Sequence, residues 1–314
     1  MPSPTLIAPH AKDLGGGFMV RRLLPSAPRR AVGPFVFFDH FGPVTAGPAD
    51  DFDVRPHPHI GLATVTYLYE GAMAHRDSLG TVQRIEPGAI NWMSAGRGIV
   101  HSERTPDDLR GTTRRSHGLQ LWVALPAERE EDPPGFAHTP AQAIPELEHA
   151  GARLRMLVGE GCGLVSPVRT ASPTLLVDLA LAPGAAFELP ALADECALYS
   201  TDADYEVDGA PVPAFHLALL APGTTVRLRA PQGARIAIVG GASLGPRHLA
   251  WNFVSSRRER IAQAQADWIA YTTTGAHAQQ TGHGFDPVPG ETDFIPLPAR
   301  PGAPPPAPTP DAAA

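Results

Sequence analysis

Two short motifs place histidine and glutamate at a spacing that suits a metal centre. His57 and His59 are separated by one residue, and so are His101 and Glu103. Side chains two positions apart in a β-strand point to the same face of a sheet. Each motif can therefore direct two ligands at one point, provided that the two strands lie side by side.

The donor set limits which ions such a site would hold. Three imidazoles and one carboxylate suit Fe(II), Mn(II), Cu(II), Co(II), Ni(II) or Zn(II), whereas Ca(II) and Mg(II) prefer oxygen ligands. Four protein ligands leave two positions of an octahedral ion open, which is typical of catalytic sites. A lone His-x-His is more often an ordinary surface or packed pair, but two same-face pairs favour a metal site. For His40, His75 and His117, which lack this pattern, packing or surface roles are favoured, with a place behind the metal ligands or in the pocket as the alternative.

Strand-like segments punctuated by glycine and proline surround both motifs. In the first half, alternating or β-branched runs occupy residues 62–69, 82–85, 90–93, 99–103 and 119–125. A second series occupies residues 153–158, 174–181, 197–200, 215–220, 225–229 and 235–239. Short strands separated by such turns are typical of an all-β sandwich or barrel.

The length of 314 residues accommodates two such domains. We expect an N-terminal metal-binding barrel at residues 1–126, an acidic, proline-rich linker at 127–150 and a second barrel at 151–295. Within the second domain, residues 256–271 combine capping-box spacing with an apolar side and predict an amphipathic helix. Residues 296–314 are rich in proline and alanine and predict an extended or disordered tail.

A short pattern recurs in the two halves and indicates an internal duplication. The turns Pro87-Gly88 and Pro222-Gly223 are followed at equal offsets by an apolar residue, an alanine and a glycine. In that register Ile236 takes the place of His101, and Ile238 takes the place of Glu103. The pattern therefore predicts a second barrel without metal ligands.

Bulk composition excludes several classes of protein. The net charge of −7, with Lys12 as the single lysine, gives no basic footprint for nucleic acid or an anionic membrane. Two distant cysteines, Cys162 and Cys196, form neither a disulfide framework nor a thiolate zinc site. Neither a signal peptide nor a long apolar stretch is evident, so we expect a cytoplasmic protein with no membrane contact.

The same motifs, in their wider context, closely resemble the pirin family. The resemblance is dense over residues 20–125 and looser beyond them. It is carried by Gly33-Pro34-Phe35, Asp39-His40-Phe41, His57-Pro58-His59-Ile60-Gly61, His75-Arg76-Asp77-Ser78 and the runs 66–71, 92–103 and 117–123.

This resemblance implies two tandem antiparallel cupin β-barrels (a bicupin) with a C-terminal helix. It implies Fe(II) in the N-terminal barrel, held by His57, His59, His101 and Glu103, and a metal-free C-terminal barrel. General cupins carry a glutamate four residues after the second histidine. Ala63 stands there in this chain, which leaves Glu103 as the carboxylate.

Some pirins are described as quercetin 2,3-dioxygenases, so the resemblance implies oxygenolytic cleavage of a flavonol or related phenolic with O2. Glu103 would then ligate the metal or take the substrate hydroxyl proton. For the substrate pocket we select four side chains, namely Phe52, Trp92, Met93 and Gln120, whereas Leu121, Val123 and Leu125 are expected in the core.

Two other functions remain open. Eukaryotic pirins resemble iron-dependent transcription cofactors, which implies a non-enzymatic regulator with a protein partner. Arg21 and Arg22 match a basic pair that would lie on its binding surface, although a solvated pair is the simpler interpretation. A zinc or manganese cupin isomerase or hydrolase is the third alternative.

Overall fold

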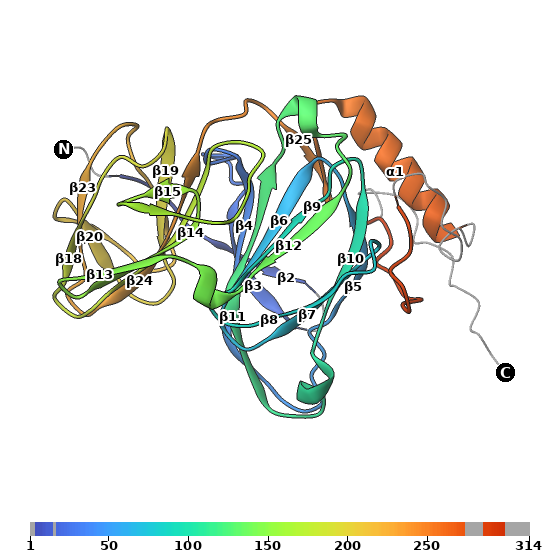
Figure 1. Ribbon diagram of the computed structural model, residues 1–314, viewed down its shortest axis with the longest axis horizontal. Helices are drawn as coiled ribbons and strands as arrows, with labels where there is room; N and C mark the ends of the chain where they lie inside the picture. Colours follow the sequence, from blue (N-terminus) through green and yellow to red (C-terminus); the bar gives the residue numbers. More distant parts are fainter. Residues whose placement is uncertain (1–3, 15–16, 274–284, 299–314) are drawn as a thin grey trace.

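The computed structural model describes residues 4–14, 17–273 and 285–298. Two β-barrels lie side by side, and the helix α1 (Arg258–Thr273) lies at the end of the molecule farthest from the C-terminal barrel (Figure 1). The prediction of an all-β, two-barrel fold with a C-terminal helix is confirmed. Of the predicted tail, only residues 296–298 fall within the described chain.

The N-terminal barrel consists of a seven-stranded sheet and a four-stranded sheet, both antiparallel. The order of the large sheet is β12 (Gly135–Thr139), β9 (Ile90–Ser94), β6 (Leu62–Glu70), β11 (Arg114–Ala124), β4 (Phe35–Ala46), β3 (Met19–Leu24) and β2 (His10–Asp13). The order of the small sheet is β5 (Val54–His59), β10 (Ile99–Arg104), β7 (Met73–Asp77) and β8 (Val82–Ile85).

The C-terminal barrel repeats this plan. Its large sheet has the order β1 (Thr5–Ile7), β22 (Leu217–Leu219), β19 (Glu195–Ser200), β24 (Ala234–Gly241), β17 (Thr174–Leu181), β14 (Ala152–Val158) and β13 (Glu146–His149). Its small sheet has the order β18 (Ala186–Leu189), β23 (Val226–Arg229), β20 (Tyr205–Val207) and β21 (Ala210–Val212). Two small hairpins complete the strands, β15 (Glu160–Gly161) with β16 (Leu164–Val165) and β25 (His248–Ala250) with β26 (Phe253–Ser255).

The strand orders correct the internal alignment. Strands β5 to β11 correspond one by one to β18 to β24, so the counterpart of β10 is β23. Ile236 and Ile238 lie on β24, the counterpart of β11, and are buried in the core of the second barrel. The Pro-Gly match failed because similar turns precede non-equivalent strands. On β23 the buried positions are Val226 and Leu228, so an apolar interior replaces the ligand positions of β10.

Strand pairing also crosses the domain boundaries expected from the sequence. Thr5–Ile7 pairs with β22 in the C-terminal barrel. The segment 127–150 gives β12 to the first barrel and β13 to the second, so it is not a plain linker. Helix α1 packs against Ile60 and Val100 of the first barrel through Ile261 and Trp268. The helix therefore covers the N-terminal barrel, although it follows the C-terminal one in the chain.

Both faces of the large N-terminal sheet are buried, one inside its own barrel and the other against the second barrel. A core cluster joins Phe38, Leu121 and Trp92 of the first barrel to Tyr199 and Val239 of the second. Odd and even positions along a strand such as β11 therefore meet different apolar surroundings. In the described chain no helix combines the length and the apolarity needed to cross a bilayer.

Candidate metal centre

Strand β5 presents two histidines to the barrel interior although prolines alternate with them. Pro56 and Pro58 lack the amide proton that a central strand would need, and β5 forms the edge of its sheet, where proline is tolerated. The open edge is covered by the C-terminal segment, because the Ile295 amide donates to the Pro56 carbonyl at 2.8 Å. His57 and His59 consequently occupy the inward positions and are buried.

Strand β10 lies directly beside β5, as the spacing of the two motifs required. His101 is the register partner of His57, and Ile99 is the partner of His59. The register shifts between His101 and Glu103. Such a bulge bends the strand and turns the side chain that follows it. The glutamate is therefore not aimed in strict parallel with His101.

The three histidines converge through their ring nitrogens. Nδ1 of His57 donates to the Arg55 carbonyl at 2.8 Å, and Nδ1 of His59 donates to the Asn252 carbonyl at 3.0 Å. These bonds leave Nε2 as the ring nitrogen with a free lone pair. One ring nitrogen from each of His57, His59 and His101 lies within 4.8 Å of the others. Nε2 of His101 is buried and has no hydrogen-bond partner among the described residues. A buried acceptor without a partner is costly unless an ion binds it, so the donor set fits a transition metal.

His75 and Asp77 lie behind His101, on the side away from His57. Nδ1 of His101 lies 3.4 Å from Nδ1 of His75, whose Nε2 lies 3.0 Å from Oδ2 of Asp77. The other carboxylate oxygen of Asp77 accepts the amides of Leu79 and Thr81. Burial acts to raise the pKa of Asp77, but the bonds from His75 and Thr81 hold it below its usual value. His75 thus orients His101, which is the alternative to the packing or surface role that the sequence favoured.

Burial keeps the three imidazoles neutral. It lowers the pKa of His57 to about 4 and places the pKa values of His59 and His101 well below the usual range. The neighbouring imidazoles lower them further, because like charges would repel at this separation. The neutral form carries the lone pair that a metal needs.

Glu103 lines the cavity onto which His57 and His59 open, and its carboxylate is held by Gln120. Oε1 of Glu103 accepts from Nε2 of Gln120 at 3.0 Å, and Oε1 of Gln120 accepts from the Thr66 hydroxyl at 2.9 Å. The Thr66 bond fixes the amide so that its NH2 group faces Glu103. Burial raises the pKa of Glu103 to about 7, against the opposing effect of the Gln120 bond.

A cavity of about 540 Å³ opens onto His57, His59 and Glu103. Its volume is in the range of small-molecule pockets. Aromatic side chains form much of its wall, namely Phe18, Phe37, Phe41, Trp122 and Trp251.

Of the four predicted pocket residues, only Gln120 lines this cavity. Trp92 belongs to the core between the barrels, and Met93 packs against Ile99 and Phe136. Phe52 stacks on Phe18 with ring centroids 4.9 Å apart and so lies one layer behind the wall. Trp92 lies on the face of β9 that packs against the second barrel. Both faces of this strand are buried, so hydrophobicity alone does not tell which face lines the cavity.

Trp122 is the main residue that the sequence reasoning missed. It is two positions from Gln120 and must share its face, while Leu121 and Val123 point to the core as expected. Its ring stacks on Phe37 at 4.0 Å and meets the His59 ring edge-on at 5.1 Å. Strand alternation predicts this placement, because Trp122 lies between Leu121 and Val123 and must point to the opposite face.

The hairpin β25–β26 completes the site from outside the N-terminal barrel. It supplies the Asn252 carbonyl to His59, and Trp251 to the cavity wall. Gly61 permits this approach, because a Cβ there would lie 2.0 Å from the Val254 carbonyl oxygen. Gly61 also has a φ of 67°, which L side chains rarely adopt.

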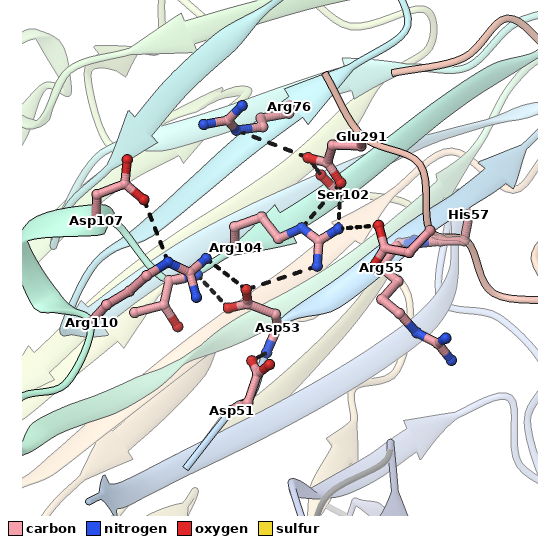
Figure 2. Close-up of polar contacts among 12 residues, drawn as sticks. Asp51, Asp53, Arg55, His57, Arg76, Ser102, Arg104, Asp107, Arg110 and Glu291 are labelled. Atoms are coloured by element: carbon pink, nitrogen blue, oxygen red, sulfur yellow. Dashed lines mark hydrogen bonds and ion pairs between the residues drawn. The ribbon is translucent and has the colours of Figure 1, made fainter. Parts of the chain in front are cut away.

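The outward side of β10 is pinned by the C-terminal segment (Figure 2). The Ser102 hydroxyl donates to Glu291 at 2.6 Å, and Arg104 bonds the same carboxylate. Arg104 also bonds Asp293 and lies 3.9 Å from Asp53. These contacts alternate along β10 with His101 and Glu103, so the strand that carries half of the candidate site is fixed from behind.

Comparisons with known proteins agree with this architecture. Two family models match, described as pirin over residues 17–123 and as the pirin C-terminal cupin domain over residues 176–273. The chain is 47% identical to a pirin-like protein of Caulobacter vibrioides, covering 82% of this chain and 90% of that protein. It is 39% identical to a Pseudomonas aeruginosa protein named as a candidate quercetin 2,3-dioxygenase, covering 83% of this chain and 82% of the other. The crystal structure of a quercetin 2,3-dioxygenase from Acinetobacter baumannii superimposes with a TM-score of 0.85 at 31% identity, covering 96% and 97% of the two chains.

Proposed function

The chain belongs to the pirin family of tandem cupins, and on that premise we propose that it is a metal-dependent dioxygenase that cleaves a flavonol such as quercetin with O2. The observation that carries the proposal is the convergence of three buried imidazoles, two of which, His57 and His59, line a 540 Å³ aromatic cavity. A metal site alone would suit many cupins. The flat aromatic wall beside it favours a planar aromatic substrate.

We assign His57, His59, His101 and Glu103 as the metal ligands and Fe(II) as the ion, with Mn, Cu, Co, Ni or Zn as the other ions that this donor set accepts. The three histidines form the compact group. Glu103 would join them by turning from Gln120 toward the ion. When bound, the ion supplies Lewis-acid activation of a substrate hydroxyl and a redox partner for O2 chemistry.

The protein's own groups then have distinct tasks. Trp122 and Phe37 orient a flat ring system beside His59. Glu103 accepts the proton of the substrate hydroxyl, since burial places its pKa at about 7, near the working range of a general base. Full coordination would lower that pKa, so this task belongs to the position in which Glu103 is held by Gln120.

The test is a turnover assay on iron-loaded protein with quercetin and oxygen, followed by loss of the flavonol absorbance. We expect oxygen-dependent loss that stops on chelation, returns with Fe(II), and is abolished in His101→Ala. His138→Ala is the matched control, because that histidine bonds Asn91 and is not part of the candidate site. Absence of turnover in fully loaded, folded protein would reject the proposal.

The alternative is a non-enzymatic, iron-dependent regulator. It would be supported by a protein partner captured in only one iron oxidation state, together with no turnover. The basic pair invoked for its surface is less suitable than the sequence suggested, because Arg21 contacts Phe215 and Arg22 points into the cavity. Metal analysis of anaerobically purified protein separates both from a zinc or manganese isomerase or hydrolase.

A further inference from the structure

A row of polar side chains crosses the large N-terminal sheet, one residue per strand, on the face that lines the cavity. Successive members of the row are register partners on neighbouring strands: Arg22 with Asp39, Asp39 with Gln120, and Gln120 with Thr66. At one end, Gln120 bonds the candidate ligand Glu103. At the other end stands Arg22. Strands are spaced by roughly 4.8 Å, so the backbone of Arg22 lies roughly 10 Å from that of Gln120, two strands away.

Apolar rows flank this polar row on both sides. Phe37 and Trp122 are register partners in one of them, and Val20 and Phe41 are partners in the other. All four line the cavity. The floor is thus an apolar surface with a single polar track that runs from the metal site to Arg22. On this part of the floor, a flat molecule would meet polar side chains along that track and apolar ones on either side of it.

Arg22 is held rigidly, yet part of its guanidinium remains available. Its Nε and Nη2 donate to the two oxygens of Asp39 at 2.8 and 2.7 Å, and its plane lies 4.3 Å from the centroid of the Phe37 ring. Nη1 donates no hydrogen bond to the residues that the structure describes, and Arg22 faces the cavity. A bidentate, stacked arginine with spare N–H groups is preorganised to bind an anionic oxygen.

We propose that Arg22 is a specificity-determining residue that binds an acidic group, a carboxylate or an ionised hydroxyl, at the end of a flat aromatic substrate opposite the metal-bound oxygen. This inference rests on the proposed function, since it takes the metal site as the anchor for the other end. The backbone separation of roughly 10 Å between Arg22 and Gln120, with Gln120 bonded to the candidate ligand Glu103, sets the scale for a fused two-ring aromatic with oxygen substituents at both ends. Lys12 lines the same cavity and adds a positive charge at that end, where the carboxylates are Asp13 and Asp39, and Asp39 is already engaged by Arg22.

The neighbouring arginine provides a matched control. Arg21 points to the opposite face of β3, where Nη1 donates to the Gly42 carbonyl and the guanidinium lies 4.4 Å from the Phe215 ring. It therefore has the same charge and the same strand but no access to the cavity. A general electrostatic effect would appear in both variants, and a specific contact only in the Arg22 variant.

The experiment measures binding of two probes to metal-loaded protein by calorimetry without oxygen. The probes are 6-hydroxy-2-naphthoate and 2-naphthol, which differ in the carboxylate at the far end. We expect the wild type to bind the carboxylate at least about tenfold more tightly, as one charge-assisted pair provides. Arg22→Gln should bring the ratio near one with little change for 2-naphthol, Arg22→Lys should retain part of the preference, and Arg21→Gln should retain it in full.

Two results would overturn the inference: a wild type without preference for the carboxylate, or a preference that survives in folded, metal-loaded Arg22→Gln. That variant can fail to fold because Asp39 is left buried without its partner. In that case the double variant Arg22→Gln with Asp39→Asn removes both charges, and a preference for the carboxylate that survives in it would equally overturn the inference. Because the readout is binding, failure of the quercetin assay would reject the dioxygenase without affecting this result.

Discussion

Asp77→Asn tests whether the histidine and aspartate behind the candidate metal centre set its chemistry. In the native protein the carboxylate accepts the proton of His75 Nε2, which leaves Nδ1 of His75 as an acceptor. Nδ1 of His101 then carries a proton toward His75, and Nε2 of His101 keeps its lone pair. This tautomer is the one that binds a metal.

Asparagine reverses this chain. Its oxygen must still accept the amides of Leu79 and Thr81, so its NH2 group faces His75. His75 Nε2 then becomes an acceptor, its Nδ1 carries the proton, and His101 is driven to the tautomer protonated at Nε2. Loss of such an outer partner costs about 10- to 100-fold in metal affinity, equivalent to about 1.4–2.7 kcal/mol.

The assay is an anaerobic titration of Fe(II) or Zn(II) against a competing chelator, with thermal unfolding measured in parallel. Asp77→Ala is the informative control, because it leaves His75 free to adopt either tautomer. We expect the asparagine variant to bind metal more weakly than the alanine variant, although alanine destabilises the turn more by removing both amide bonds. Native affinity in Asp77→Asn, or a weaker affinity in Asp77→Ala than in Asp77→Asn, would refute the tautomer argument.

Three further predictions concern the site and the fold. Glu103→Gln should lower metal occupancy, because a neutral amide is a poorer ligand for a dication; full, tightly held metal in that variant would exclude Glu103 as a ligand. Ile238→Ala should leave metal content unchanged and lower the free energy of unfolding by about 2–5 kcal/mol, since the side chain is fully buried; denaturant titration and metal analysis check both parts. Burial lowers the pKa of His40 to about 3, below its unfolded value, so it costs stability as the pH falls below about 6.5. His40→Gln should reduce the slope of the unfolding free energy between about pH 6 and 4 by about 1.4 kcal/mol per pH unit, and an unchanged slope would contradict this assignment.

Local sequence determined the features that repeat with the period of a strand. The His-x-His and His-x-Glu spacings fix which side chains share a face, whatever the rest of the chain does. Glycine and proline fix where strands end, so the all-β class could be read without a structure. Alternation along β11 likewise places Trp122 on the same face as Gln120.

Only the tertiary structure decided which face of a strand looks into the cavity and which distant segments touch the site. The large N-terminal sheet is buried on both sides, so hydrophobicity gave no reason to place Trp92 in the inter-barrel core and Trp122 beside His59. The Asn252 carbonyl reaches His59 across 193 positions of the chain, a contact with no local signature. Alternation fixes relative orientation within a strand, whereas the choice of inside and outside depends on what packs against the sheet.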